Sequence, residues 1–199
     1  MFPLSISLIT IIFWLLSKPN LASITIDPLL SLSQMASLIG TVLLSFTFIL
    51  SSRLKFLEKI FYNLGTIYKN HHLFGVISFL LLISHPLLLA SKALLNSLPA
   101  TIYLIPSANL IYSAGVLALY SLILLLIFTL LIKLPYQLWL KTHHFMGIVL
   151  FFALIHINFI ISDISRFPLL KIWILFWLLS ALISYFYVRF IYPKTLKKI

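Results

Sequence analysis

Cysteine is absent from the 199 residues, and acidic residues and glycine are scarce, with three Asp/Glu and five Gly. The lack of cysteine excludes disulfides, zinc–thiolate sites, iron–sulfur clusters held by cysteine, and covalent haem attachment through C-x-x-C-H. No G-x-G-x-x-G segment, the phosphate-binding motif of dinucleotide domains, occurs in the chain. Any metal must therefore be held by histidine or oxygen, and we expect no flavin or nicotinamide site in this sequence.

Charged residues make up only 9% of the chain and hydrophobic residues 62%, against roughly 45–50% apolar residues in soluble domains. The apolar runs are continuous and lack the alternation of a membrane strand, so they predict helices, which satisfy their own backbone in lipid. The first run resembles a signal peptide in length but has no basic residue ahead of it. We predict one all-α membrane domain over residues 1–199, a six-helix bundle with spans at about 1–17, 34–52, 73–91, 108–132, 142–161 and 172–192.

The fourteen Lys/Arg give a net charge of +11, which in a soluble protein would suggest a nucleic-acid partner. Here they flank the apolar runs, so we expect membrane lipid around the chain and no nucleic acid. Ten fall on one set of connections: Arg53, Lys55, Lys59, Lys69, Lys133, Lys141, Arg189, Lys194, Lys197 and Lys198. The opposite set holds Lys18, Lys92, Arg166 and Lys171. The positive-inside bias therefore predicts a cell-membrane protein with both termini cytoplasmic. The basic segment 53–69 is predicted to form an interfacial amphipathic helix.

All six histidines lie in or at the start of the third and fifth predicted spans. The two segments repeat each other: NHHLFGV at 70–76 precedes His85, and THHFMGI at 142–148 precedes His156. Fourteen residues from His71 to His85 cover about 21 Å of helix and return to within about 40° of the same face. His72 would miss that face by about 140°, so we favour His71.

The fifth span is harder to place, because His143 and His144 both lie more than about 100° from His156 on an ideal helix. A wide turn within the helix would bring His143 to the face of His156. The repeat favours His143, since Gly75 and Gly147 would then lie one turn along, where a flat ring could approach closely. Whether His72 or His144 replaces its neighbour is left open by the spacing.

Buried histidines on two facing membrane helices, at two matched depths, indicate two stacked sites. Zinc would require four ligands around one centre and commonly a carboxylate partner, and no acidic residue is near in sequence. Haem needs only two axial imidazoles and an apolar slot. We therefore predict two non-covalent b haems; the competing interpretation is that these histidines relay protons or join helices.

At these residues the sequence resembles the ferric reductase-like transmembrane domain shared by ferric-chelate reductases and NADPH oxidases. The resemblance covers about 53–161 and is carried by His71-x-x-x-Gly75 with His85, and by Trp139-x-x-x-His143-His144 with His156. It implies an inner haem between His71 and His143 and an outer haem between His85 and His156. Cations that could pair with haem propionates are Lys69, Lys141, Arg166 and Lys171.

The resemblance implies transmembrane electron transfer to an outside acceptor, such as ferric iron, oxygen or a partner protein. Members usually continue into a domain that binds flavin and nucleotide, which this sequence lacks, so the expected donor is a separate flavoprotein or a quinol. The chain would then be an oxidoreductase component with no catalytic residue of its own. One alternative is the haem subunit of a methionine sulfoxide reductase-like system, which usually has a basic residue in place of His71. Another is a non-redox transporter or assembly protein, for which polar groups at the midplane would be typical.

Overall fold

The computed structural model describes residues 2–191, and the regular elements within that range are all helical. Lys194, Lys197 and Lys198, which contribute to the predicted cytoplasmic charge, lie outside the described residues. The long helices are α3 (Pro28–Ser51), α5 (Leu64–Leu95), α7 (Leu110–Leu126), α9 (Met146–Phe159) and α11 (Pro168–Phe186). The shorter ones are α1 (Phe2–Leu16), α2 (Ala22–Ile26), α4 (Lys55–Phe61), α6 (Thr101–Leu104), α8 (Tyr136–His144) and α10 (Asp163–Arg166). Two π-helical turns, η1 (Ile127–Leu131) and η2 (Tyr187–Ile191), extend α7 and α11.

Five helical segments of the described chain are long and apolar enough to cross a membrane, so the prediction of a helical membrane protein is confirmed. They are Pro28–Ser51, Leu64–Leu95, Leu110–Leu131, Tyr136–Phe159 and Pro168–Ile191. The first predicted span corresponds to α1, which has 15 residues. At about 1.5 Å per residue it covers about 22 Å, less than the ~30 Å hydrocarbon core. The count of six spans is therefore not confirmed.

Two long helices begin earlier than the apolar runs because polar residues cap them. The Asp27 carboxylate accepts the Leu30 N–H at 3.1 Å at the start of α3, and the Asn63 side chain accepts the Thr66 N–H at 2.8 Å at the start of α5. The prediction of one interfacial helix over 53–69 is therefore wrong. Within this segment, α4 is a short helix of its own, and the residues from Leu64 onward already belong to α5. Tyr62, with φ of 68°, lies at the turn between the two helices.

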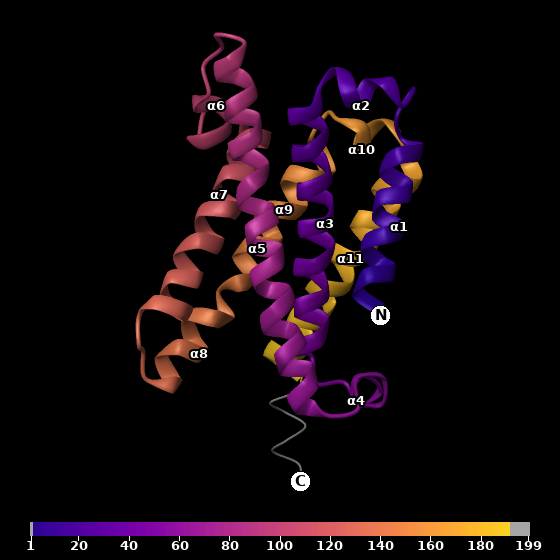
Figure 1. The fold of residues 1–199 in the computed structure, drawn as a ribbon. Coiled ribbons are helices and arrows are strands. Elements are labelled where there is room, and N and C mark those ends of the chain that lie inside the picture. The colour runs from indigo at the N-terminus through magenta and orange to yellow at the C-terminus, as the bar shows by residue number, and fades with distance from the viewer. Residues whose placement is uncertain (1, 192–199) are drawn as a thin grey trace.

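Helix α3 lies at the centre of the bundle (Figure 1). It packs against α5 on one side and against α11 and α1 on others, while α7 packs on α9 and α11 also contacts α9. The fully buried side chains come mainly from α3 and α11: Val42, Phe46, Leu50, Leu170, Ile174 and Ala181. Helices α5 and α9, which carry the deep histidines, thus belong to two different packed pairs.

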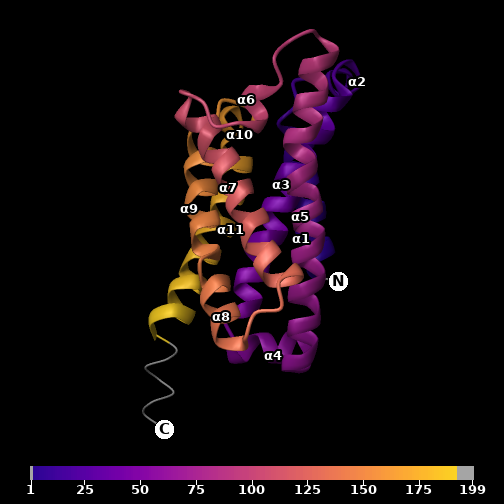
Figure 2. The ribbon, with the colours of Figure 1, turned by 90° about the vertical axis from the view of Figure 1, so that its left-hand side faces the viewer.

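The connecting segments gather at two ends of the bundle in both views (Figures 1 and 2). Helices α2, α6 and α10 lie at one end, here called the α10 end, and α4 and α8 lie at the other, the α4 end. Helix α1 begins partway along the bundle and rises to the α10 end. The α10 end corresponds to the predicted outer side and the α4 end to the predicted inner side.

Candidate functional site

The four predicted ligand histidines lie as two pairs between α5 and the α8–α9 segment. Toward the α4 end, the His71 and His143 ring centroids are 6.2 Å apart. Toward the α10 end, His85 and His156 line one cavity of about 280 Å³. His72, the neighbour of His71, is exposed. Within residues 2–191 no group of three or more His, Cys, Asp or Glu could hold a metal ion, so the histidines are arranged as pairs.

Three of the four rings are held by a backbone carbonyl from a neighbouring helix. Nδ1 of His71 lies 2.9 Å from the Thr47 carbonyl oxygen, Nδ1 of His85 lies 3.1 Å from that of Ser33, and Nδ1 of His156 lies 2.8 Å from that of Ile111. A carbonyl oxygen only accepts, so Nδ1 must carry the proton and Nε2 keeps its lone pair. This is the arrangement in which histidine binds a metal through Nε2, with its other nitrogen fixing the ring.

The Ser33 side chain also contacts His85 through its hydroxyl. Its hydroxyl donates to the His85 carbonyl oxygen at 3.0 Å and lies 2.7 Å from Nδ1. Ser33 is fully buried, so neither bond exchanges with water. The ring of His85 is therefore oriented before any ligand arrives, and only its Nε2 edge is left for binding.

His143 is supported differently. Its Nδ1 is buried and has no hydrogen-bond partner among the described residues. Its ring instead stacks on Trp139, one turn earlier in α8, with centroids 5.3 Å apart and planes 16° apart. An unpartnered buried nitrogen costs about 1–3 kcal/mol, and such groups in native proteins commonly mark a functional site.

Three glycines near the histidines differ in what surrounds the position where a side chain would begin. A side chain at Gly115 on α7 would come within 2.8 Å of Nδ1 of His156, so glycine lets that ring lie against the helix. A Cβ at Gly75 would meet nothing within 4 Å, which agrees with space for a flat ring beside His71. The same prediction for Gly147 is wrong, because the Tyr185 ring fills that position. Sequence reasoning missed Gly115, since it is remote from every histidine along the chain.

The expected wide turn between His143 and His156 is also wrong. The segment is instead interrupted at Phe145, where α8 ends and α9 begins. The bonds there are tighter than helical: the Phe145 N–H donates to the Thr142 carbonyl oxygen at 3.0 Å, and the Ile148 N–H donates to that of Phe145 at 2.9 Å. Wide turns do occur, but at η1 and η2, after α7 and α11.

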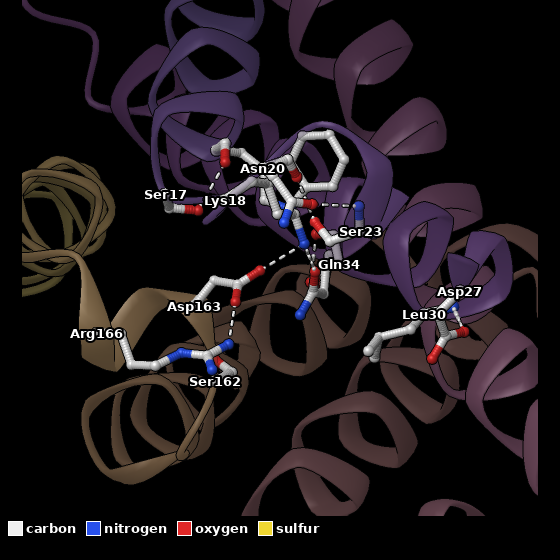
Figure 3. A network of polar contacts seen from close by, with 12 residues as sticks. Ser17, Lys18, Asn20, Ser23, Asp27, Leu30, Gln34, Ser162, Asp163 and Arg166 are labelled. Carbon is white, nitrogen blue, oxygen red and sulfur yellow. Dashed lines mark hydrogen bonds and ion pairs between the residues drawn. The ribbon is translucent and has the colours of Figure 1, made fainter. Parts of the chain in front are cut away.

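A buried ion pair lies beside the cavity at the α10 end, where Gln34 and Asp163 are among the lining residues (Figure 3). The Lys18 ammonium donates to Gln34 Oε1 and to Asp163 Oδ2, both at 2.6 Å, and the Lys18 and Asp163 side chains are only 7% and 6% exposed. Asp163 also pairs with Arg166, and Lys171 donates to the Asn158 carbonyl oxygen at 3.0 Å. Arg166 and Lys171, the two cations expected to pair with haem propionates at this end, thus already have protein partners. Sequence reasoning missed the Lys18–Asp163 pair because 145 residues separate its members.

The charges of the two ends differ. At the α10 end, Lys18, Lys92 and Arg166 each pair with an aspartate. Burial raises the pKa of Asp27, but hydrogen bonds from Lys92 and the Leu30 N–H outweigh it, and the pKa lies below the usual 3.8. Among the described residues, the α4 end has one acidic residue, Glu58, beside seven cations: Arg53, Lys55, Lys59, Lys69, Lys133, Lys141 and Arg189. Positive charge is therefore concentrated at the α4 end.

These residues suit an iron ion held between two imidazoles. A metal–imidazole bond is about 2 Å, as for zinc, and a distance of 6.2 Å between the ring centroids of His71 and His143 is compatible with both rings binding one ion. Three Nδ1 atoms are already tied to carbonyls, one buried Nδ1 is unpartnered, and open space adjoins Gly75. On these observations the residues fit bis-histidine haem.

Comparison with protein families matches residues 36–155 to the family described as ferric reductase like transmembrane component. The match covers 120 residues (155 − 36 + 1) of 199, more than half of the chain. It contains His71, His85 and His143 and ends one residue before His156. No curated protein matched the chain.

Proposed function

We propose that this chain, which belongs to the ferric reductase like transmembrane component family, carries single electrons across the cell membrane through two b haems. In this proposal residues 1–199 act as one membrane domain. One haem is held by His71 and His143 near the α4 end, and the other by His85 and His156 near the α10 end. The observation that carries the proposal is the set of Nδ1–carbonyl bonds, which leave Nε2 of His71, His85 and His156 free for a metal.

Haem iron, when bound, supplies reversible one-electron oxidation and reduction. The chain's own residues bind and orient it. The carbonyls of Thr47, Ser33 and Ile111 keep the proton on Nδ1, so each imidazole presents a lone pair without needing to lose a proton. Two histidines at each site would leave no iron position for a substrate, so the chemistry that the group would supply is electron transfer.

Part of the bundle near the two pairs is apolar and buried. Val149 and Leu150, which follow the break between α8 and α9, are buried, as is Leu122 on α7. In an apolar surrounding of low dielectric constant, nearby charges and dipoles act more strongly on the charge of a bound metal. The fixed carbonyl contacts of the histidines are therefore expected to set the reduction potentials.

The direction of transfer is proposed from the charges. The concentration of Lys and Arg at the α4 end favours a cytoplasmic position for that end by the positive-inside bias. The proposal puts both termini on the same side, which requires that α1 also crosses the membrane. The donor is then a flavoprotein or quinol that acts at the α4 end. The acceptor, which is ferric iron, oxygen or a partner protein, is reached at the α10 end.

Histidine variants test this proposal directly. In the purified protein, His71→Ala or His143→Ala should remove the haem of the α4-end pair and leave most of the other spectrum. His85→Ala or His156→Ala should remove the other haem. His72→Ala is the matched control, because His72 is exposed, and it should keep both. A protein without haem, or one in which His72→Ala alone loses a haem, would contradict the proposal.

A further inference from the structure

The break between α8 and α9 changes the backbone hydrogen bonds, and the carbonyl of His144 loses its helical partner there. In a continuous α-helix the Ile148 N–H would donate to the carbonyl of His144, four residues earlier. Here it donates to Phe145, three residues earlier, at 2.9 Å. A carbonyl left without a donor at membrane depth costs several kcal/mol, so the interruption is stable only if another group donates to His144.

Tyr185 supplies that donor from α11. Its hydroxyl donates to the His144 carbonyl oxygen at 2.9 Å, across 41 residues of sequence. The ring is also held on its other side, where it packs edge-on against Phe48 of α3 with centroids 6.3 Å apart. Tyr185 thus connects the central helix α3 to the point where the histidine-bearing segment is interrupted.

Gly147 is what admits the Tyr185 ring. A Cβ at this position would come within 2.7 Å of Cε1 and 2.8 Å of the hydroxyl oxygen of Tyr185. Contacts this short force a shift of the ring or of the backbone, and either would disturb the bond between Tyr185 and the His144 carbonyl. The glycine that the sequence repeat suggested for haem contact therefore accommodates a tyrosine in the fold.

The interruption controls how His143 is turned relative to His156. Thirteen residues of ideal helix would leave the two about 140° apart, and the tighter bonds around Phe145 change that rotation. His143 lies next to His144, whose carbonyl Tyr185 contacts, and within residues 2–191 no hydrogen bond to Nδ1 of His143 fixes its ring. The backbone at His144 is therefore a main determinant of the direction of the His143 imidazole.

We infer that Tyr185 is a positioning residue, which holds the α8–α9 break through the His144 carbonyl and so orients His143 for the haem at the α4 end. The inference rests on the proposed function only in naming haem as the group that His143 meets. The hydrogen bond from Tyr185 to the His144 carbonyl at the α8–α9 break does not depend on haem.

The test uses Tyr185→Phe, which keeps the ring and removes the hydroxyl. Tyr120→Phe is the matched control, because the Tyr120 hydroxyl also donates to a backbone carbonyl, that of Leu104, on the α6–α7 side. Amide hydrogen exchange of the peptide over 142–149 should become about 5-fold faster in Tyr185→Phe, as expected for a net loss of one hydrogen bond. It should not change in Tyr120→Phe.

A second measurement follows the haem of the His71–His143 pair. Its midpoint potential and low-temperature electron paramagnetic resonance signal should shift in Tyr185→Phe, while those of the other haem stay unchanged. Gly147→Ala should shift the same signals, because it displaces the same ring. Unchanged exchange over 142–149 would overturn the inference, and so would faster exchange with an unchanged haem signal. If the protein holds no haem, the proposed function fails, and the exchange experiment still decides whether Tyr185 holds the break.

Discussion

The buried ion pair of Lys18 and Asp163 offers a quantitative test of how the α10 end is held together. Asp163→Asn keeps the shape of the side chain and removes its charge. Lys18 would then stay buried with Gln34 as a neutral partner, since only 7% of its side chain is exposed. Breaking a buried pair from one side costs about 3–5 kcal/mol, because the remaining charge has lost its partner. At about 2–4 °C per kcal/mol for a chain of this size, the melting temperature should fall by roughly 6–20 °C.

The assay is thermal unfolding of the purified protein in detergent, followed by tryptophan fluorescence. Trp14 reports locally, because the Lys18 ammonium lies 4.6 Å from its ring centroid. Asp27→Asn is the matched control at the more exposed pair with Lys92, where a loss of only about 0–1 kcal/mol is expected. The double variant Lys18→Met with Asp163→Asn should recover part of the stability, because no buried charge remains unpaired. A melting temperature for Asp163→Asn no lower than for Asp27→Asn, or no recovery in the double variant, would refute the reasoning.

Three further predictions concern the haem slot, the effect of pH and the topology. Gly75→Ala should leave the haem-free protein at least as stable as wild type, since its Cβ meets nothing and alanine is favoured over glycine inside a helix. It should nevertheless alter the spectrum of the His71–His143 haem, and an unchanged spectrum would exclude a ring beside Gly75. Because the pKa of Asp27 is lowered below 3.8, its pair with Lys92 should stabilise the protein at neutral pH and be lost only as the pH falls below about 4. The melting-temperature difference between wild type and Asp27→Asn should therefore be constant from pH 7 to 5 and shrink at lower pH. In this cysteine-free chain, Tyr62→Cys and Leu98→Cys, both at exposed positions, should react with an impermeant thiol reagent from opposite sides of the membrane, Leu98→Cys from outside; labelling from one side would contradict the topology.

The helical membrane class and the family could be predicted from the sequence because both depend on local patterns. Continuous apolar runs identify membrane helices whatever they pack against, and five of the six predicted runs meet the length needed to span. The first does not, because hydropathy measures the apolar character of a run and not whether the helix is long enough. Helix starts were misplaced for a related reason: Asp27 and Asn63 cap α3 and α5 outside the apolar runs.

The part of the candidate site that depends on histidine spacing along one helix could be predicted from the sequence. The 14-residue interval chose His71 over His72, and the structure places His71 against His143 while His72 is exposed. The contacts that orient the rings were not predictable, since a backbone carbonyl such as that of Thr47 or Ile111 has no sequence signature. The break at Phe145 was missed because the donor that stabilises it, Tyr185, comes from another helix.

The central claim is that each pair of histidines holds one haem, and haem stoichiometry tests it most directly. The measurement is the haem b content of the purified protein by the pyridine haemochrome method, set against chain concentration from amino-acid analysis, with carbon monoxide added to the reduced sample. We expect two haems b per chain and no carbon monoxide spectrum, because in the proposal histidine would occupy both axial positions of each iron. One haem or none per chain, or a carbon monoxide complex in the wild type, would contradict the account.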